Sequence, residues 1–230
     1  MHIPDGFIDG TTSAFGGGVA VGTVAGCLRR TRDLLDDRQV PLVGLTSAFV
    51  FAAQMLNFPV AAGTSGHLLG GVLAAVLVGP WAGALAVSVV LVVQALLFAD
   101  GGLSALGLNV VNMALVGALG GYAVFAAIRA LLPKTKASVV AAAGVAAALA
   151  PTMAAIVFTA EYALGGNGAA SVATVAKAMI GVHLLIGVGE GAITAMTISA
   201  VMATRPDLVH GAAHIATRAP SRDDTAGVPA

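Results

Sequence analysis

The sequence predicts an all-α polytopic membrane protein with about seven transmembrane helices. Hydrophobic residues make up 58% of the 230 residues, charged residues make up only 10%, and the mean hydropathy is +0.95. Crossing a bilayer requires about 20 helical residues, and six apolar runs approach or exceed that length. The six runs are residues 8–28, 41–58, 81–99, 107–128, 138–160 and 175–203. A shorter seventh run, residues 68–79, lies between the second and the third.

The short run decides the number of spans, because Gly79-Pro80 separates it from the next run and this pair breaks helices. A hairpin at the break gives seven spans, whereas one kinked helix gives six. Cytoplasmic loops are enriched in Lys and Arg. With seven spans and an outer N-terminus, about ten of the 11 cations are cytoplasmic and only Lys177 is outside. With six spans, about five cations are cytoplasmic and six are outside, so the positive-inside rule favours the seven-span topology.

The first apolar run is expected to be a membrane anchor rather than a cleaved signal peptide. No cation precedes it, whereas Arg29, Arg30 and Arg32 follow it, which is the reverse of a signal peptide. We expect one transmembrane domain at residues 1–205 and a short, polar, frayed cytoplasmic tail at 206–230. The single cysteine, Cys27, lies in this first run and excludes an internal disulfide or a Cys-based zinc site. Its expected role is packing.

The chain begins with a pattern typical of a metal chelate. The Met1 amine, the deprotonated His2 amide and His2 Nδ1 would close fused five- and six-membered rings around an ion. Three nearly coplanar nitrogens favour square-planar Ni(II) or Cu(II) and leave one position open. His2 is bulky enough to protect Met1 from removal, and residues 3–6 are predicted to form a tight turn with Pro4 at its second position. We therefore expect an ordered terminus.

A loop at residues 57–67, rich in Pro and Gly, ends at His67 just before the short run. The seven-span topology places His67 on the outer side together with His2, where the chelate lacks a fourth nitrogen. A histidine at the start of a helix is also commonly a cap or a surface residue. Four polar residues are candidates for orienting the imidazoles, although loop hydroxyls often satisfy only their own backbone. They are Asn57, Thr64, Ser65 and Asp100.

Three motifs together resemble the CbiM/NikM family, the metal-capturing subunits of energy-coupling-factor importers for cobalt and nickel. The motifs are Met1-His2-Ile3-Pro4-Asp5-Gly6-Phe7, residues 63–71 (GTSGHLLGG) and residues 94–102 (QALLFADGG). The resemblance extends over about residues 1–200. It implies a seven-helix subunit in the cell membrane that binds its metal through the Met1 amine, the His2 amide and imidazole, and His67. It also implies a transmembrane coupling subunit, cytoplasmic ATPases and often a small extra membrane subunit as partners.

The remaining features are weaker. The sequence has no phosphate-binding G-x-x-x-x-G-K-[ST] loop, so we expect a binding subunit rather than an enzyme. Nickel or cobalt would be its substrate, and no cofactor is expected. We expect membrane lipid around the protein and no nucleic-acid partner. A planar four-nitrogen site favours nickel, but the family includes importers of both metals. Small residues recur along one face of the first run and suit close packing within the chain or with a partner. They are Ala14, Gly18, Gly22 and Gly26.

An intramembrane metal-dependent enzyme using His67, His183 and Glu190 is the main alternative, and a passive channel subunit is another. Ionisable residues at membrane depth are functional candidates, but we expect His183 and Glu190, seven residues apart on one helix face, to form a buried structural pair. The expected outer position of His67 also separates it from Glu190. No H-E-x-x-H motif is present.

Overall fold

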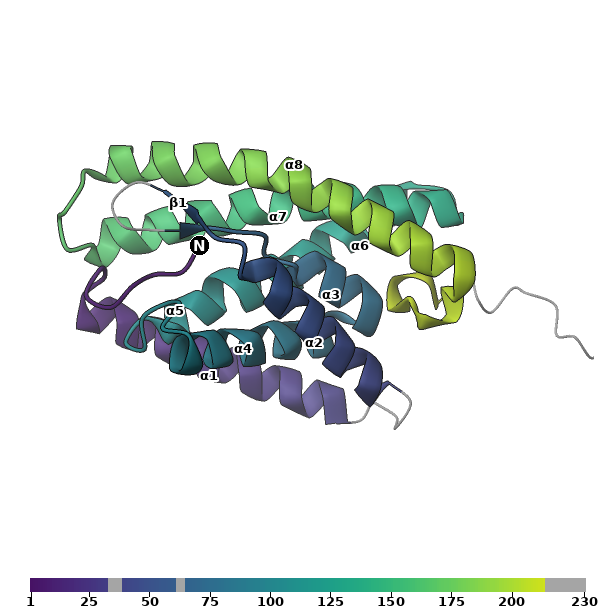
Figure 1. Cartoon of the computed structure of the whole chain (residues 1–230), viewed down its shortest axis with the longest axis horizontal. Coiled ribbons are helices and arrows are strands. Elements are labelled where there is room, and N and C mark those ends of the chain that lie inside the picture. Colours follow the sequence, from purple (N-terminus) through teal and green to yellow (C-terminus); the bar gives the residue numbers. More distant parts are fainter. Residues whose placement is uncertain (33–38, 61–64, 214–230) are drawn as a thin grey trace, which may run out of the picture.

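The computed structural model describes residues 1–32, 39–60 and 65–213, and there the chain forms an elongated bundle of helices (Figure 1). A π-helical stretch, η2 (Val111–Gly120), joins two α-helices into one continuous helix. Two-residue strands β1 (Phe58–Pro59) and β2 (Ser65–Gly66) pair antiparallel. The α-helices are α1 (Gly10–Arg32), α2 (Val40–Gln54), α3 (Gly71–Val78), α4 (Pro80–Leu97), α5 (Leu106–Val110), α6 (Gly121–Leu131), α7 (Lys136–Gly165) and α8 (Val172–Thr204).

The helices match the predicted apolar runs in order and type. Five helices in the described part of the chain are long and apolar enough to cross a membrane, namely Gly10–Arg32, Pro80–Leu97, Leu106–Leu131, Lys136–Gly165 and Val172–Thr204. Helices α2 and α3 are apolar but shorter, at 15 and 8 residues. The protein is therefore a multi-pass membrane protein, as predicted.

The break at Gly79-Pro80 is a turn between two packed helices. Gly79 has a φ of 91° and follows α3, and Pro80 is the first residue of α4, where proline needs no amide partner. A Cβ added to Gly83 would lie 2.6 Å from the backbone nitrogen of Ala75. Helices α3 and α4 therefore fold back on each other, as the hairpin interpretation requires.

The small-residue face of α1 points away from the rest of the described chain. A Cβ added to Gly18, Gly22 or Gly26 would meet nothing within 4 Å, and Ala14 is exposed. The buried face of α1 instead carries Ser13, Gly16, Ala20, Cys27 and Thr31, which confirms the expected packing role of Cys27. The small-residue face therefore does not pack within the described part of the chain, which leaves packing with a partner as the other interpretation.

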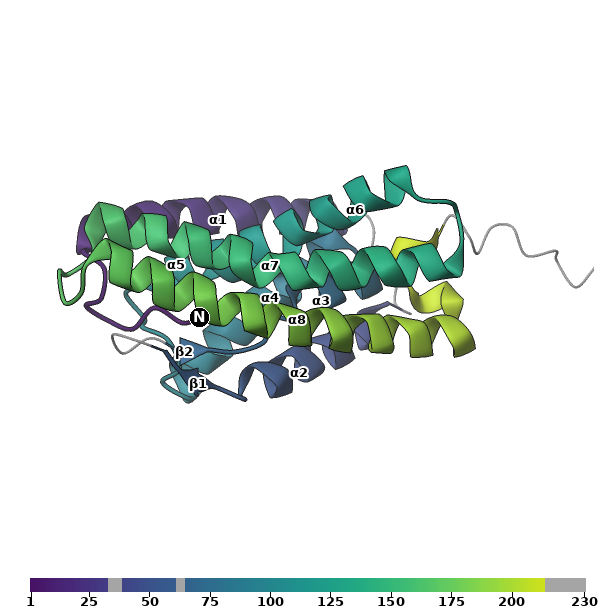
Figure 2. The same cartoon turned by 90° about the horizontal axis from the view of Figure 1, so that it is seen from above.

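Most described cations lie at one end of the bundle, where α1 ends, α6 connects to α7 and α8 ends (Figure 2). The predicted tail begins at this end. Its first residues are packed rather than frayed, because residues 206–208 and 210–212 form 3₁₀ turns, η3 and η4. Val209 and Ala212 are buried there against apolar residues such as Phe125. The rest of the tail, from residue 214, lies outside the described residues.

We predict that Gly83→Ala destabilises the protein, because the new methyl group would press on the α3 backbone, which cannot move aside like a flexible side chain. Overpacking of this kind typically costs about 1–3 kcal/mol. Thermal unfolding in detergent measures the effect. Gly22→Ala is the matched control, since its methyl group enters open space and alanine has the higher helix propensity. Equal melting temperatures for both variants would contradict the tight α3–α4 contact.

Candidate metal centre

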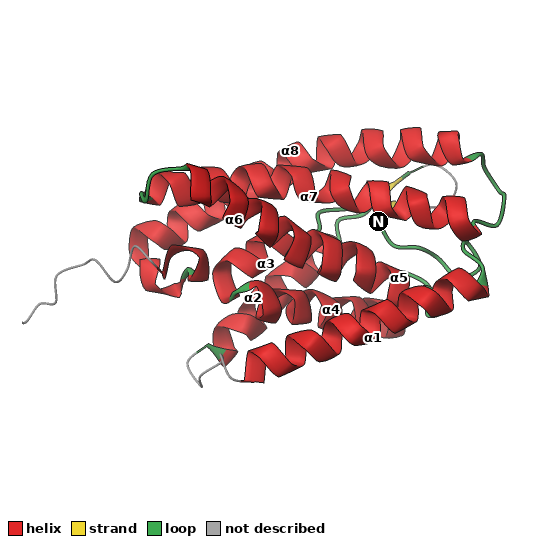
Figure 3. Ribbon diagram, turned by 180° about the vertical axis from the view of Figure 1, so that it is seen from behind, coloured by secondary structure: helices red, strands yellow, loops and turns green. Residues whose placement is uncertain are grey.

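The N-terminal segment is docked inside the bundle, beside the β1–β2 hairpin (Figure 3). Met1 and Ile3 are fully buried and His2 is 4% exposed. Asn109 on α5 binds both backbone groups of Ile3, accepting its N–H at 2.8 Å and donating to its carbonyl at 3.4 Å. The Gly102 amide also donates to the Ile3 carbonyl, at 2.8 Å. The segment is thus held much like a strand in a sheet, and the expectation of an ordered terminus is met.

The turn that follows is shifted by one residue from the prediction. The Phe7 amide donates to the Pro4 carbonyl at 3.3 Å, and Gly6 has a φ of 73°. Pro4 is therefore the first residue of the turn and not the second. The reason is that the Ile3 carbonyl, which would close the predicted turn, is already used by Gly102 and Asn109.

The structure brings His2 and His67 together. Their rings stack with centroids 4.6 Å apart and planes 28° from parallel. His67 is fully buried in the irregular segment between β2 and α3. Its Nδ1 lies 2.8 Å from the carbonyl of Leu68, which can only accept, so Nδ1 carries the proton and Nε2 presents a lone pair. That Nε2 has no hydrogen-bond partner among the described residues.

Burial keeps the nitrogens of this site neutral. Loss of hydration lowers the pKa of the Met1 amine well below 8.0, against a smaller opposing effect of Asp100. Burial, and next the terminal amine, lower the pKa of His2 to about 3. The same two causes, in the same order, hold the pKa of His67 well below 6.5, with smaller contributions from His2 and His183. Unprotonated nitrogens are the form that binds metal ions.

An ion held by His2 and His67 would need further ligands. In residues 1–32, 39–60 and 65–213, no group of three or more His, Cys, Asp or Glu side chains is arranged to hold a metal. Two imidazoles alone do not make a transition-metal site. The His2 amide makes no hydrogen bond to a described residue, whereas the next amide, of Ile3, is bound by Asn109. The backbone amide nitrogen of His2 is therefore available as a metal ligand.

Two of the four candidate orienting residues form a chain leading to His2. The Asn57 side-chain amide donates to Asp100 Oδ2 at 2.8 Å, and the same oxygen lies 3.6 Å from His2 Nε2. Ser65 lies in β2, paired with Pro59, and Thr64 lies outside the described residues. Next to Asp100, Gly101 has a φ of 91°, and a Cβ there would lie 3.0 Å from His2 Nδ1. This glycine leaves room for the imidazole.

The expected pairing of His183 with Glu190 does not form. His183 Nδ1 donates to the Met179 carbonyl at 2.7 Å, whereas the Glu190 carboxylate accepts the amides of Leu69 and Gly70. The expected separation of Glu190 from His67 is also wrong. Residues 65–70 dip between the helices, so that a Cβ on Gly66 would lie 2.9 Å from Ile186 of α8. The segment that carries His67 therefore lies against the middle of α8, and His67 is fully buried.

Asn109 is the contributor that sequence reasoning missed, whereas Glu190 was considered a functional candidate but was assigned the wrong partner, His183. Each is a buried polar side chain on an apolar helix, which is the one signal that could have marked it. That signal does not say which backbone groups such a side chain reaches. Their partners are 106 to 121 residues away along the chain.

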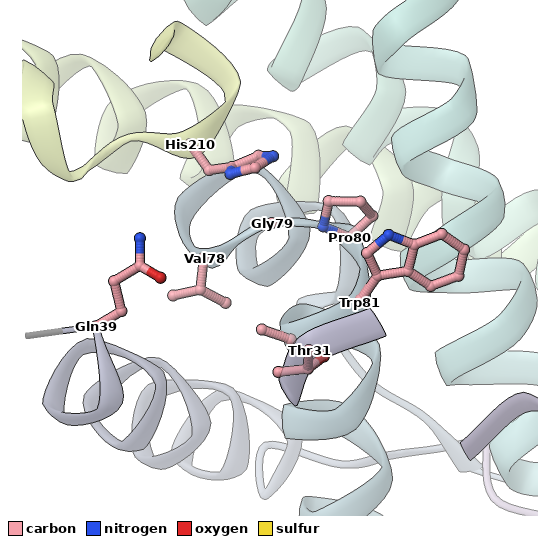
Figure 4. Close-up of a pocket in the computed structure, with 8 residues that line it drawn as sticks. Thr31, Gln39, Val78, Gly79, Pro80, Trp81 and His210 are labelled. Atoms are coloured by element: carbon pink, nitrogen blue, oxygen red, sulfur yellow. The ribbon is translucent and has the colours of Figure 1, made fainter. Parts of the chain in front are cut away.

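His210 lies far from this centre, at the opposite end of the bundle. It lines a cavity of about 370 Å³ together with Thr31, Gln39, Gly79 and Trp81 (Figure 4). Its ring also lies 6.2 Å from that of Tyr122. This cavity shares no residue with the docked N-terminus, and His210 takes no part in the candidate metal centre.

Comparison with known proteins supports a transport role for this architecture. A family model described as "Cobalt uptake substrate-specific transmembrane region", CbiM, matches residues 2–208. A putative metal transport protein of Haloquadratum walsbyi is 40% identical, with 91% of this chain and 93% of that protein covered. A putative fused nickel transport protein, NikMN, of Archaeoglobus fulgidus is also 40% identical, covering 91% and 68%. A cobalt transport protein, CbiM, of Sorangium cellulosum is 37% identical, covering 91% and 94%.

Solved structures share the fold as well. A crystal structure of a transition metal transporter superposes with a TM-score of 0.82 and 27% identity, covering 95% of this chain and all of that one. A truncated transition metal transporter gives a TM-score of 0.81 and 29% identity, covering 88% and 99%. The docked terminus, the apolar helices and these similarities agree, and this chain belongs to the CbiM family of cobalt and nickel transport membrane proteins.

Proposed function

We propose that this protein is the metal-capturing subunit of an ATP-driven importer for divalent nickel or cobalt. The observation that carries the proposal is the buried terminus. Met1 is fully buried, and His2 stacks on His67, whose Nε2 has no hydrogen-bond partner among the described residues. The Met1 amine, the His2 amide, His2 Nδ1 and His67 Nε2 are the four proposed donors. They supply the planar nitrogen set that favours nickel, which also stands above cobalt in the general affinity order.

The proposed role of Asp100 is to orient His2 and to offset charge. With Nδ1 bound to the metal, Nε2 carries a proton and points toward the Asp100 carboxylate at 3.6 Å. Carboxylates commonly hold metal-bound imidazoles in this way. A divalent ion bound to one deprotonated amide leaves a net charge of about +1, which is costly to bury. Asp100, itself held by Asn57, supplies the compensating negative charge.

The energy for uptake is proposed to come from partner subunits. The sequence carries no nucleotide-binding loop, and the relatives are named transport proteins. We propose a transmembrane coupling subunit and cytoplasmic ATPases as partners, together with a small membrane subunit. A relative named as a fused protein, only 68% of which is covered by this chain, supports the last of these. The open face of Ala14, Gly18, Gly22 and Gly26 is the proposed contact for a partner helix.

The proposed orientation places the N-terminus outside and the C-terminus in the cytoplasm. The clustering of described cations at the end of the bundle where α1 and α8 finish is what supports it. The candidate metal centre then lies in the outer half of the bundle, where its residues are buried. The tail from residue 206 belongs to the cytoplasmic side in this orientation.

An N-terminal extension tests the proposal. Adding residues before Met1 converts its amine to an amide, removes one donor and places new atoms where Met1 is fully buried. We expect nickel and cobalt binding to be lost while the fold survives. Calorimetry in detergent compares the extended protein with one carrying the same residues after Ala230. Equal affinity of the two proteins would exclude the amine as a ligand.

Replacing His67 and His183 separately distinguishes a metal ligand from a residue that only lies near the metal. We expect His67→Ala to weaken nickel binding by more than the roughly 10–100-fold typical of changes outside the coordination sphere, because it removes a donor nitrogen. His183→Ala should weaken it less, since His183 lies near the site but outside the proposed donor set. Titration of both variants with nickel gives the two losses. Equal losses would indicate that the ion binds deeper, nearer α8.

Metal binding should weaken as the pH falls from 8 to 5. Docking lowers the pKa of the Met1 amine and His2 from 8.0 and 6.5, so protons bind the undocked terminus preferentially. The docked state is therefore fully favoured above pH 8 and loses ground as the pH falls. Release of the His2 amide proton adds to this dependence. The measurement is bound nickel against pH, at metal concentrations just saturating at pH 7.5.

A carboxylate site would behave differently and would hold its metal down to about pH 4, near the ordinary Asp and Glu values. Full nickel occupancy at pH 5 would therefore assign the ion to Asp5, Asp9 or Asp100 instead of the nitrogens.

A further inference from the structure

Glu190 is a buried carboxylate that the proposed coordination does not use. It lies in the middle of α8 and is 3% exposed. Its Oε2 accepts the amide of Leu69 at 2.6 Å and its Oε1 accepts the amide of Gly70 at 2.9 Å. Both oxygens thus hold backbone groups that lie just two and three residues after His67.

The same short segment is fixed from its other side. Gln54 at the end of α2 donates from Nε2 to the Leu69 carbonyl at 2.7 Å. Gly70 has a φ of 70°, a conformation suited to glycine, and a Cβ there would lie 3.0 Å from Val50. The backbone at residues 69 and 70 is therefore clamped between α2 and α8.

This clamp determines where His67 points. The imidazole is oriented by its own Nδ1–H, which donates to the Leu68 carbonyl at 2.8 Å. That carbonyl belongs to the peptide whose amide is the Leu69 N–H bound by Glu190. One rigid peptide unit therefore links the carboxylate to the imidazole. A shift of this peptide would rotate the ring and change where the Nε2 lone pair lies relative to His2, whose ring stacks on that of His67.

Removing the carboxylate would leave two buried amides without partners. Irregular backbone at membrane depth persists only where its polar groups are satisfied by protein or water. Gln54 does offer an acceptor, because its Oε1 has no hydrogen-bond partner among the described residues. Its side chain holds the segment from the α2 side, however, so the two amides would have to turn away from α8 to reach it. The segment would therefore relax toward other acceptors and carry His67 with it.

We propose that Glu190 is a positioning residue for metal capture, acting through Leu69 and Gly70 to hold His67 Nε2 toward the N-terminal chelate. Glu190 is not itself a ligand in this proposal. The inference rests on the proposed function, because it assumes that His67 supplies a donor. It gives the middle of α8 a direct mechanical connection to the metal site.

A double-mutant cycle tests the proposal on the full chain with its native N-terminus. The variants are Glu190→Ala, Glu190→Gln, His67→Ala and His67→Ala combined with Glu190→Ala. Glu161→Gln is the matched control, a buried α7 carboxylate that instead accepts from Asn112 at 2.7 Å. Nickel affinity is measured for each variant. Electron paramagnetic resonance of bound Cu(II) counts the coordinated nitrogens, and thermal unfolding without metal reports on the fold.

We expect Glu190→Ala to weaken nickel binding about 10–100-fold, less than His67→Ala does, and to convert part of the four-nitrogen copper signal to a three-nitrogen one. Glu190→Gln should lie between this variant and the wild type, because its amide oxygen can accept one of the two N–H groups. In the His67→Ala background, Glu190→Ala should change affinity by no more than about twofold. Glu161→Gln should retain four nitrogens and the wild-type affinity.

Two results would overturn the inference. One is additive loss in the double variant, which would mean that Glu190 acts independently of His67. The other is an entirely four-nitrogen copper spectrum in both Glu190 variants. If His67→Ala itself binds nickel like the wild type, the proposed donor set fails instead. That outcome is distinct, because it is decided without any Glu190 variant.

Discussion

The Met1 amine is buried, and much of the surrounding structure exists to keep it there. An amine loses hydration when it enters an apolar interior, and this loss lowers its pKa well below 8.0. Docking therefore favours a neutral amine with a lone pair, as metal binding also requires. The backbone beyond it must be held firmly, and Asn109 and Gly102 do this by binding Ile3. The free terminus is held in one place only because these partners outweigh its tendency to fray.

Two irregular segments meet at the same place for a related reason. At membrane depth, backbone outside helices carries unpaired polar groups, which are tolerated only where the segment is buried in protein or lines a water-filled cavity. The N-terminal residues use Asn109, and the segment after His67 uses Glu190 and Gln54. Each irregular segment is thus satisfied by polar side chains on apolar helices. The stacked His2 and His67 rings lie where the two segments touch.

The order of the helices and an ordered N-terminus were predictable from sequence, because apolar runs and turn residues are local patterns. The hairpin at Gly79-Pro80 was predictable for the same reason. The burial of Met1 and His2 inside the bundle was not predicted. The depth of His67 was not predictable either, because nothing local indicates that residues 65–70 dip between helices to reach α8. The true register of the turn at Pro4 depends on Asn109, 106 residues from Ile3. Pairing of His183 with Glu190 was inferred from helical spacing alone, which cannot detect that a backbone segment from elsewhere occupies the carboxylate.

X-ray absorption at the nickel edge, on protein with its unmodified N-terminus, tests the central claim most directly. The predicted spectrum is that of a square-planar ion with four nitrogen donors and no bound water, since the Met1 amine, the His2 amide and two imidazoles fill the plane. A six-coordinate shell rich in oxygen would contradict it. Such a result would mean that carboxylates and water hold the ion, and that the buried amine serves the fold alone.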